Sequence, residues 1–391
     1  MLTLQLRSRD GLARRAVVHT AHGSIETPNF MTVGTLGSVK GILPQQLGDL
    51  GAQVMLMNAF HLAWRPGENL VSQMGGLHKF CGWPRPILTD SGGFQIFSLP
   101  GLRKITDEGA LFANAVDGSL RLFSPEAVVD IECALAPDMA MVLDECPPYP
   151  CTPAELTGAV DRSVRWAERS WKHVLKLQGD GRSEPPPAGA AAGTHRTPYV
   201  NFFGIVPGGF NDHERQRSLD ATAAIPFPGL ALGGFCVGET IEDTHHGITF
   251  TAPKMPAERP RYLMGMGTPE DILLAVAHGI DLFDCTIPTR NGRNGLAFTA
   301  TGTVRIKNSR HGSSALPLDP HCACYTCRNF SRAYLRHLFL AREMNAAILM
   351  SLHNVAFYLQ LMQDIRKAIE ESRLAAFSAE FLARWRSESQ E

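Results

Sequence analysis

The sequence predicts an α/β fold, a (β/α)8 TIM barrel with a zinc-binding subdomain near the C-terminus. Eight short runs that are apolar or rich in β-forming residues recur between residues 27 and 286, and helix-compatible stretches separate most of them. Near-continuous apolar strands indicate burial on both faces, which is typical of a parallel sheet. Eight such β/α units favour a closed barrel over a doubly wound sheet. From about residue 315 this rhythm stops and a cysteine cluster follows.

The predicted strands follow one another in chain order. They are TPNFMTVG (27–34), VMLMNAF (54–60), PILTDSGG (86–93), MAMVLDE (139–145), YVNFFGIV (199–206), LALGGF (230–235), RYLMGMG (261–267) and IDLFDCT (280–286). Two stretches between them, 124–136 and 155–177, fit crossover helices. Ser124 is a suitable N-cap for the first of these, and Pro125 fits its first helical position.

We expect the whole chain, 1–391, to form a single TIM-barrel catalytic domain. Residues 178–198 are rich in Gly, Pro and Ala and almost free of large apolar side chains, which predicts a flexible surface insertion. Residues from about 315 to 360 hold the cysteine cluster and are predicted to form the zinc-binding subdomain. Helical periodicity then continues to Trp385.

Composition narrows the class of protein. The chain has 391 residues, of which 44% are hydrophobic and 19% charged, and its formal net charge is −1. That charge excludes a protein that coats nucleic acid by bulk charge, although a local basic patch remains compatible with it. No apolar run approaches the roughly 18–20 residues of a membrane span, and the first 25 residues lack the apolar core of a signal peptide. Nine cysteines, odd in number and mostly scattered, favour a reducing compartment, so we expect a cytoplasmic protein with no membrane partner.

The strongest local signal is the stretch HCACYTCRNF. It places Cys322, Cys324 and Cys327 within six residues, so three thiols can point at one centre, and Zn²⁺ is the usual occupant of such a site in a reducing compartment. His353 is the best fourth ligand, because no further cysteine follows in the sequence. We therefore expect one structural Cys₃His zinc site. The alternatives are three unrelated buried or redox thiols and a core histidine with its own hydrogen bonds.

Three aspartates end predicted strands. Asp90 ends ILTD, Asp144 ends MVLD and Asp284 ends LFD, so in a parallel barrel all three fall on the C-terminal rim, where catalytic groups gather. A single aspartate in this position is more often a helix cap. Three of them, each followed by a glycine-rich or irregular loop, favour a site. Paired carboxylates suit chemistry at an anomeric carbon, where one attacks C1′ and another moves a proton.

Basic residues concentrate after the last predicted strand. Between residues 290 and 342 the only acidic residue is Asp319. The basic residues there are Arg290, Arg293, Arg305, Lys307, Arg310, Arg328, Arg332, Arg336 and Arg342. A solvated face usually alternates in sign, so this region favours contact with a phosphate backbone.

Taken together, these stretches resemble the tRNA-guanine transglycosylases (queuine/preQ1 tRNA-ribosyltransferases) of the bacterial type. The resemblance covers nearly the whole chain apart from 178–198. It rests on VGTLGSVKG, FHLAWRPG, GGLHKFCGWPRPILTDSGGFQIFSL, DECPPYP, LALGGFCVGE, YLMGMG, LFDCTIPTRNGRNG and CACYTCRNFSRAYLRHLF with its downstream LHN. It implies an enzyme of queuosine biosynthesis that exchanges guanine at the wobble position of tRNAs with GUN anticodons, those for Asp, Asn, His and Tyr, for a 7-deazaguanine. Family members resemble a TIM barrel with a zinc-binding subdomain and usually act as homodimers.

The resemblance also implies roles for residues. Asp284 matches the nucleophile that forms a covalent intermediate with the ribose, and Asp90 matches the general acid/base. Asp144 matches the carboxylate that reads the N–H edge of the base, for which ionised oxygens are suitable acceptors. The other positions that match base-binding residues are Ser91, Gly92, Gly93, Phe94, Gly234, Phe235, Cys236, Glu239 and Met264. Arg290 and Arg293 match residues that hold the anticodon loop, and the four predicted zinc ligands match the family's own, including the spacing of Cys327 and His353.

Three departures from the family pattern bear on which base enters. The family strand usually ends in Val-Gln-Gly-Gly, but Pro207 replaces the glutamine. Ala59 replaces a threonine, and Phe235-Cys236 replaces Leu-Ala. Losing a hydrogen bond to a buried purine edge costs about 1–3 kcal/mol if its partner stays unpaired. Because the catalytic carboxylates are intact, we expect the reaction to survive. We expect Asp144 and a bound water to recognise the purine in place of the missing glutamine amide.

These residues favour an active enzyme that uses preQ1. The sequence DEC, Val237 and the zinc spacing are of the bacterial type, and the bulk of Phe235 disfavours the cyclopentenediol of queuine. A queuine-salvaging enzyme is the first alternative. A catalytically silent subunit that binds tRNA or a homologous catalytic chain is the second, although it would need neither Asp90 nor Asp284. An enzyme acting on another nucleic acid or tRNA position is the third.

Overall fold

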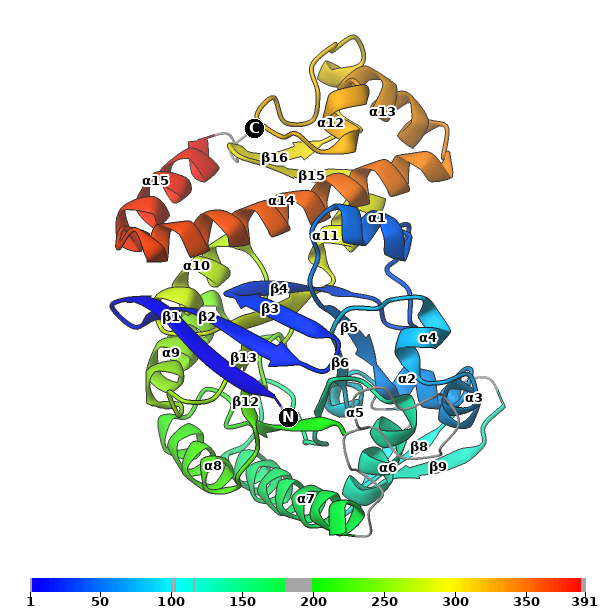
Figure 1. Cartoon of the computed structure of the whole chain (residues 1–391), viewed down its shortest axis with the longest axis vertical. Coiled ribbons are helices and arrows are strands. Elements are labelled where there is room, and N and C mark those ends of the chain that lie inside the picture. The colour runs from blue at the N-terminus through cyan, green and yellow to red at the C-terminus, as the bar shows by residue number, and fades with distance from the viewer. Residues whose placement is uncertain (1, 100, 102, 115–116, 180–198, 388–391) are drawn as a thin grey trace.

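A computed structural model describes residues 2–99, 101, 103–114, 117–179 and 199–387 (Figure 1). Eight parallel strands form a closed barrel in the order β10-β11-β12-β13-β14-β4-β5-β6. Their bounds are β4 Asn29–Val33, β5 Met55–Asn58, β6 Ile87–Asp90, β10 Met139–Met141, β11 Asn201–Val206, β12 Gly229–Leu232, β13 Arg261–Leu263 and β14 Leu282–Cys285. Each lies within or within one residue of a predicted run, so the predicted TIM barrel is confirmed.

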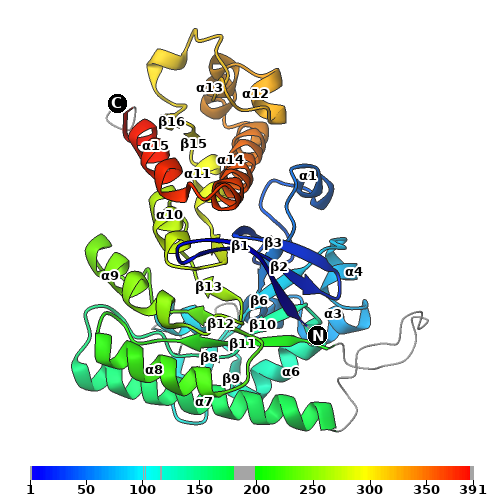
Figure 2. The same cartoon turned by 60° about the vertical axis from the view of Figure 1, so that its left-hand side comes forward.

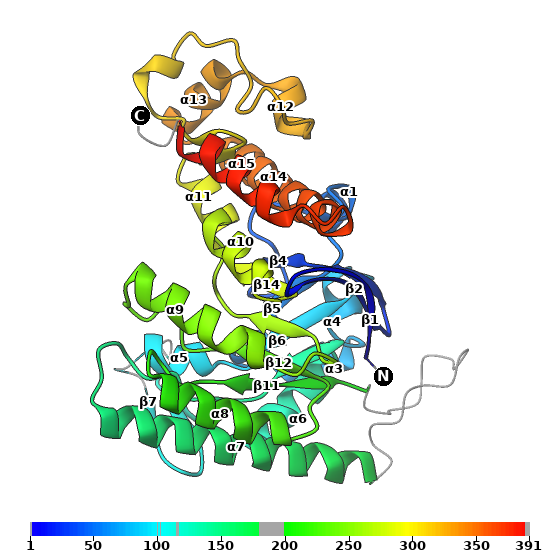
Figure 3. The same cartoon turned by 90° about the vertical axis from the view of Figure 1, so that its left-hand side faces the viewer.

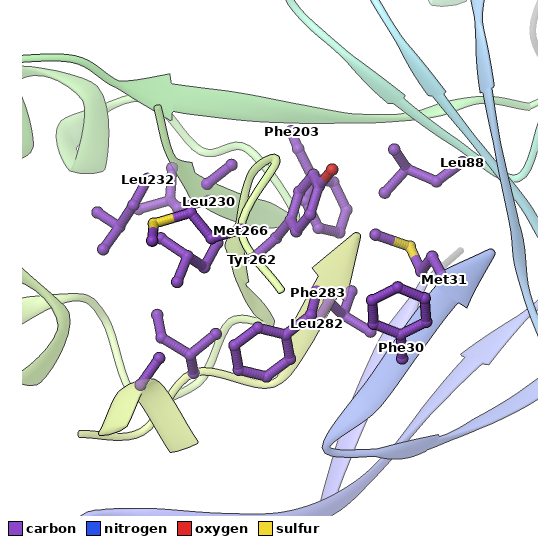
Figure 4. Packing of buried hydrophobic residues seen from close by; sticks show 14 of the residues in the cluster. Phe30, Met31, Leu88, Phe203, Leu230, Leu232, Tyr262, Met266, Leu282 and Phe283 are labelled. Atoms are coloured by element: carbon purple, nitrogen blue, oxygen red, sulfur yellow. The ribbon is translucent and has the colours of Figure 1, made fainter. Parts of the chain in front are cut away.

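Large apolar side chains from neighbouring strands fill the barrel. Figure 4 shows Phe203 of β11, Tyr262 of β13 and Phe283 of β14 close together in the interior. All three are at most 1% exposed. The strands are short and their residues almost entirely buried, because helices cover the outside while these side chains fill the inside. The barrel is therefore a packed core, and only its rims are free to carry chemistry.

Helices follow the strands and cover the barrel (Figures 1 and 2). They are α1 Pro44–Asp49, α2 Ala59–Trp64, α3 Glu68–Gln73, α4 Leu77–Cys81, α5 Gly93–Ser98, α6 Pro125–Leu135, α7 Pro153–Gly179, α8 Asp212–Ala224, α9 Ile241–Thr251, η2 Ala252–Lys254, α10 Pro269–Ala277 and α11 Ile287–Arg293. Ser124 caps α6 as predicted, with its hydroxyl accepting from the N–H of Ala127 at 3.1 Å. Helix α7 is two residues longer at each end than predicted. Apart from its first two residues, the predicted insertion 178–198 lies outside the described residues.

Three antiparallel sheets were not predicted, and two of them precede the C-terminal part. The first consists of β1 Thr3–Asp10, β2 Ala13–Thr20 and β3 Gly23–Thr27. It binds the N-terminal ends of barrel strands, since Arg14 forms an ion pair with buried Asp281, next to β14. The second consists of β7 Arg103–Ile105, β8 Ala110–Ala113 and β9 Leu120–Phe123, between α5 and α6.

The C-terminal part lies on one side of the barrel, with α12 and α13 beyond the long helix α14 (Figures 1 and 3). Its elements are β15 Leu296–Thr299, β16 Gly302–Arg305, η3 Ser309–His311, α12 Tyr325–Asn329, α13 Arg332–Leu340, α14 Met344–Glu370 and α15 Leu374–Ser387. A small apolar core joins Cys327 to β15 and β16 through Ala297 and Val304. The boundaries 315–360 of the zinc-binding subdomain stay a prediction. In the described part of the chain, no helix has the length and apolarity to cross a membrane.

Candidate active site

Three carboxyl groups meet at the C-terminal rim of the barrel. Asp90 is the last residue of β6, Asp284 is the third of the four residues of β14, and Asp144 follows β10 by three residues. Asp144 and Asp284 are buried and Asp90 is partly exposed. Burial and the charge of Asp284 raise the pKa of Asp90 to about 7. Burial and the charge of Asp90 raise the pKa of Asp144 to about 7. The three groups thus form one electrostatic cluster.

Asp284 is held by two hydrogen bonds from neighbouring strand β13 and its loop. The hydroxyl of Tyr262 donates to Oδ1 at 2.6 Å, and the N–H of Gly265 donates to the same oxygen at 2.7 Å. Burial raises the pKa of Asp284, and these two donors oppose that rise. Both donors bind Oδ1, and no hydrogen bond to Oδ2 is found within the described residues. Tyr262 was missed by sequence reasoning, because a tyrosine inside an apolar run reads as core.

Asp90 is held from the adjacent strand. Asn58 lies opposite Asp90 in the pairing of β5 with β6, and its Nδ2 donates to Asp90 Oδ2 at 2.9 Å and to Gln95 Oε1 at 3.2 Å. Asn58 Oδ1 accepts from the N–H of His61 at 3.1 Å, which caps α2. These contacts fix the Asn58 amide. Alanine instead of threonine at position 59 therefore leaves the support of Asp90 in place.

Asp144 is surrounded by glycines. A Cβ on Gly93 would lie 1.8 Å from Asp144 Oδ1, so only glycine fits where α5 begins. A Cβ on Gly233 would lie 3.5 Å from Asp144 Oδ2 and 3.8 Å from the sulfur of Met264. Gly93 thus lies against the Asp144 carboxylate, and Gly233 lies near both Asp144 and Met264. The roles of these residues in a base pocket stay a prediction.

The loop Ser91-Gly92-Gly93, whose residues are predicted to bind the base, directly follows Asp90. Ser91 and Gly92 are buried, and their N–H groups lower the pKa of Asp90, although burial outweighs them. Phe94 is 43% exposed on α5. A large aromatic ring exposed next to a rim of carboxylates is available to stack on a planar ligand.

The loop after β12 is ordered by Glu239. Its carboxylate accepts from the N–H groups of Cys236 at 2.6 Å and Val237 at 2.8 Å. Gly234 and Cys236 both have positive φ, 75° and 61°. The ring of Phe235 is buried and lies 4.3 Å from the guanidinium carbon of Arg215. It therefore fills space next to α8, and our expectation that its bulk narrows the base pocket is not supported by this packing.

Pro207 is buried directly after β11. It has neither a side-chain amide nor a backbone N–H. Arg290 and Arg293 are in α11, which starts two residues after β14, and they are exposed and partly exposed. The predicted phosphate-binding arginines are thus a short distance along the chain from Asp284.

The four predicted zinc ligands meet at one point. Their ligand atoms all lie within 4.8 Å of one another, and His353 Nδ1 is 3.3 Å from Cys327 Sγ and 3.5 Å from Cys324 Sγ. His353 Nε2 lies 2.7 Å from the carbonyl oxygen of Phe298, which requires the proton on Nε2 and leaves the Nδ1 lone pair facing the thiols. This second hydrogen bond is typical of a metal-binding histidine. The donor set fits a tetrahedral Zn²⁺.

A buried acid behind Asp90 was also missed. Glu132 of α6 is fully buried, with one oxygen 2.5 Å from the hydroxyl of Thr89 and the other without a partner in the described residues. Burial raises its pKa well above the ordinary value. Glutamate on a helix gives no sequence signal of burial, since the residue is normally exposed.

Comparisons with known proteins agree over nearly the full chain. The family model described as "Queuine tRNA-ribosyltransferase" matches residues 9–387. A protein of that name from Methylobacillus flagellatus is 46% identical over 376 residues, which cover 96% of each chain. Proteins of the same name from Thioalkalivibrio sulfidiphilus and Solidesulfovibrio magneticus are 47% and 48% identical and cover 98% and 97% of each chain.

Glu132→Gln should stabilise the protein at pH 8 and much less at pH 5. The folded-state pKa of Glu132 is raised, so above its unfolded pKa the wild type must hold a proton that the unfolded chain releases. That penalty grows by about 1.4 kcal/mol per pH unit until the folded pKa is reached. Urea unfolding at the two pH values measures it.

Glu126→Gln on the same helix is the matched control. Arg169 lowers the pKa of Glu126 against the opposing effect of burial, so this variant should lose stability at pH 8. A wild type and Glu132→Gln variant with the same pH dependence of unfolding would contradict a protonated Glu132.

Proposed function

The chain belongs to the queuine tRNA-ribosyltransferase family, whose members are pentosyltransferases, and we propose that it exchanges guanine at the wobble position of tRNAs with GUN anticodons for a 7-deazaguanine. The tRNAs would be those for Asp, Asn, His and Tyr, and the exchange would be a step of queuosine biosynthesis. The observation that carries the proposal is Asp284, held by Tyr262 and Gly265 on the same rim as Asp90.

Asp284 is the nucleophile in this proposal. Its free Oδ2 attacks C1′ of the ribose, and the C1′–N9 bond breaks with its electron pair leaving on guanine. The product is a covalent ester between the tRNA and Asp284. The hydrogen bonds from Tyr262 and Gly265 fix the direction of the carboxylate and oppose the rise in its pKa that burial causes.

Asp90 moves the proton in both halves of the exchange. It protonates the departing guanine, and the resulting carboxylate then accepts the N9 proton of the incoming base, whose N9 displaces Asp284 from C1′. A general acid/base works best when its pKa is near the operating pH. The pKa of Asp90 is raised to about 7 by burial and by the charge of Asp284, which supports both roles.

The base would lie between Phe94 and Met264. Asp144 would accept hydrogen bonds from the N–H edge of the base, and Ser91, Gly92, Gly93 and the main chain of Gly234 and Cys236 would line the remaining sides. Glu239 supports this loop, because its carboxylate accepts hydrogen bonds from two backbone N–H groups. Arg290 and Arg293 would bind phosphates of the anticodon loop.

We favour preQ1 as the incoming base, with queuine as the alternative. Val237 is buried, 6% exposed, in the loop held by Glu239. In our proposal a β-branched side chain in this loop would restrict the room for a large 7-substituent. A non-catalytic tRNA-binding subunit is a weaker alternative, because the supported Asp90 and Asp284 have no purpose in it.

Cys322, Cys324, Cys327 and His353 would hold one structural Zn²⁺. Bound there, the Zn²⁺ would join the segment that holds the three cysteines to His353 of α14. It would take no part in the exchange itself. All nine cysteines are free, which supports a reducing, cytoplasmic location.

A homodimer is supported by exposed apolar residues on the C-terminal part and nearby α1. Tyr325, Tyr334, Met344 and Leu43 are between 42% and 80% exposed. Segments next to two of them are in contact, since a Cβ on Gly41 would lie 3.6 Å from the Cα of Ile348. Exposed apolar residues gathered on one side are typical of an interaction surface.

The exchange reaction can be measured directly. Wild-type protein should incorporate radiolabelled guanine into unmodified tRNA-Tyr, and Asp284→Ala should lower the rate by about 1,000-fold or more because the nucleophile is lost. Asp130→Ala, an exposed position on α6, is the control and should match the wild type. No incorporation by folded, zinc-loaded wild type would refute the active enzyme and leave the silent-subunit alternative.

The same assay ranks the bases. Unlabelled preQ1, preQ0 and queuine compete with labelled guanine, and preQ1 should compete at the lowest concentration. Stronger competition by queuine would establish the salvage alternative.

Zinc removal should unfold the C-terminal part first. Cys324→Ser should lower the bound zinc from one ion per chain to near zero and lower the melting temperature, because the metal's binding free energy stabilises the fold. Cys81→Ser, which lies outside the cluster, should keep its zinc. Elemental analysis and calorimetry test this, and a zinc-free variant that melts with the wild type would contradict a structural role.

A further inference from the structure

Arg215 of α8 joins the ends of two barrel strands at the proposed base pocket. It is 1% exposed. Its Nε donates to the carbonyl oxygen of Gly209 at 2.7 Å, and its Nη1 donates to those of Val206 at 3.0 Å and Gly233 at 2.8 Å. One planar guanidinium therefore connects the end of β11 to the end of β12, across the position of Pro207.

The charge of Arg215 is buried, and the Glu239 carboxylate of the neighbouring loop stabilises it from a distance. Arg215 forms no ion pair within the described residues, and its Nη2 has no hydrogen-bond partner there. The ring of Phe235 covers the guanidinium at 4.3 Å. Burial lowers its pKa only to about 10, so it stays a cation at neutral pH. A buried, unpaired N–H group costs about 1–3 kcal/mol, and a functional site is a common reason for such a cost.

Arg215 and Asp144 lie on either side of two consecutive glycines. The Cβ position of Gly233 is 3.5 Å from Asp144 Oδ2, and the Cβ position of Gly234 is 3.8 Å from Arg215 Nη2. A carboxyl group and a cationic donor group thus lie on opposite sides of the same pair of glycines. Guanine and 7-deazaguanine present the complementary pair on one edge, an N1–H and 2-amino group beside a 6-carbonyl oxygen.

We propose that Arg215 is the specificity-determining residue for the 6-carbonyl group of the base, an inference that rests on the proposed function. It positions the Gly233–Gly234 main chain through its bond to the Gly233 carbonyl oxygen, and its buried charge favours a partly negative oxygen on that side of the pocket. Pro207 has no amide to offer this oxygen, so the preference depends on Arg215. Asp144 reads the opposite, N–H side of the same edge.

Two guanine analogues separate the two sides. 2-Aminopurine lacks the 6-oxygen, and hypoxanthine lacks the 2-amino group. Both compete against labelled guanine in the exchange assay, which gives inhibition constants. The wild type should prefer guanine over 2-aminopurine by about 10- to 100-fold, the range that one or two buried hydrogen bonds supply.

Arg215→Lys keeps the charge but cannot bridge three carbonyl groups. It should raise the KM for guanine about 10-fold with the KM for tRNA unchanged, and reduce the preference over 2-aminopurine to a few-fold. The preference over hypoxanthine should persist. Arg217→Lys, on the same helix and in ion pairs with Asp161 and Glu214, is the control and should keep all three values.

A rescue variant distinguishes positioning from general damage. Adding Pro207→Gln to Arg215→Lys supplies a side-chain amide donor and should restore part of the preference over 2-aminopurine. If Arg215→Lys does not fold, Arg215→Gln replaces it with the same expected loss. The proposal would be overturned if Arg215→Lys kept the wild-type preference for guanine over 2-aminopurine. It would also be overturned if the preferences over 2-aminopurine and hypoxanthine were lost equally and Pro207→Gln restored neither. A wild type without exchange would instead refute the proposed function.

Discussion

Two hydrogen bonds to one oxygen of Asp284 decide how the rim of this barrel can act. Three carboxyl groups crowd a poorly hydrated rim, where burial alone would favour the protonated form of each. Tyr262 and Gly265 both donate to Asp284, so two donors oppose the effect of burial on its carboxylate. Its charge then raises the pKa of Asp90, and the charge of Asp90 in turn raises the pKa of Asp144. An acid that titrates near neutrality beside a carboxylate held by two donors follows from this order.

The barrel makes this arrangement through strand register and through residues that bridge neighbouring strands. Asp90 is opposite Asn58, whose amide supports it. Asp284 is supported from the next strand, β13. Arg215 connects the ends of β11 and β12 in the same manner. At the opposite end of the barrel, the pair of Arg14 and Asp281 attaches the N-terminal sheet beside β14. Asp90 and Asp284 are therefore each positioned by a neighbouring strand, which a closed parallel barrel supplies on both sides.

The sequence predicted the barrel well because its strands are buried on both faces and read as apolar runs. The aspartates were found because they interrupt those runs at the ends, and the zinc ligands because three cysteines lie within six residues. The residues and strands that were missed do not stand out from their neighbours in the sequence in this way. Tyr262 reads as one more core residue, Glu132 and Arg215 read as exposed helix residues, and β7 to β9 are short and partly exposed. The direction of the Phe235 ring depends on its contact with Arg215, which only the three-dimensional structure reveals.

Mapping the covalent intermediate tests the central claim most directly. The wild-type enzyme would be incubated with tRNA-Tyr at pH 7, denatured, and digested with nuclease and protease before mass spectrometry of the ribose-bearing peptide. We expect a ribosyl ester on Asp284, in the peptide that contains Leu282-Phe283-Asp284-Cys285. An ester on Asp90 or Asp144, or exchange that proceeds with no trapped peptide while Asp284→Asn remains active, would contradict it.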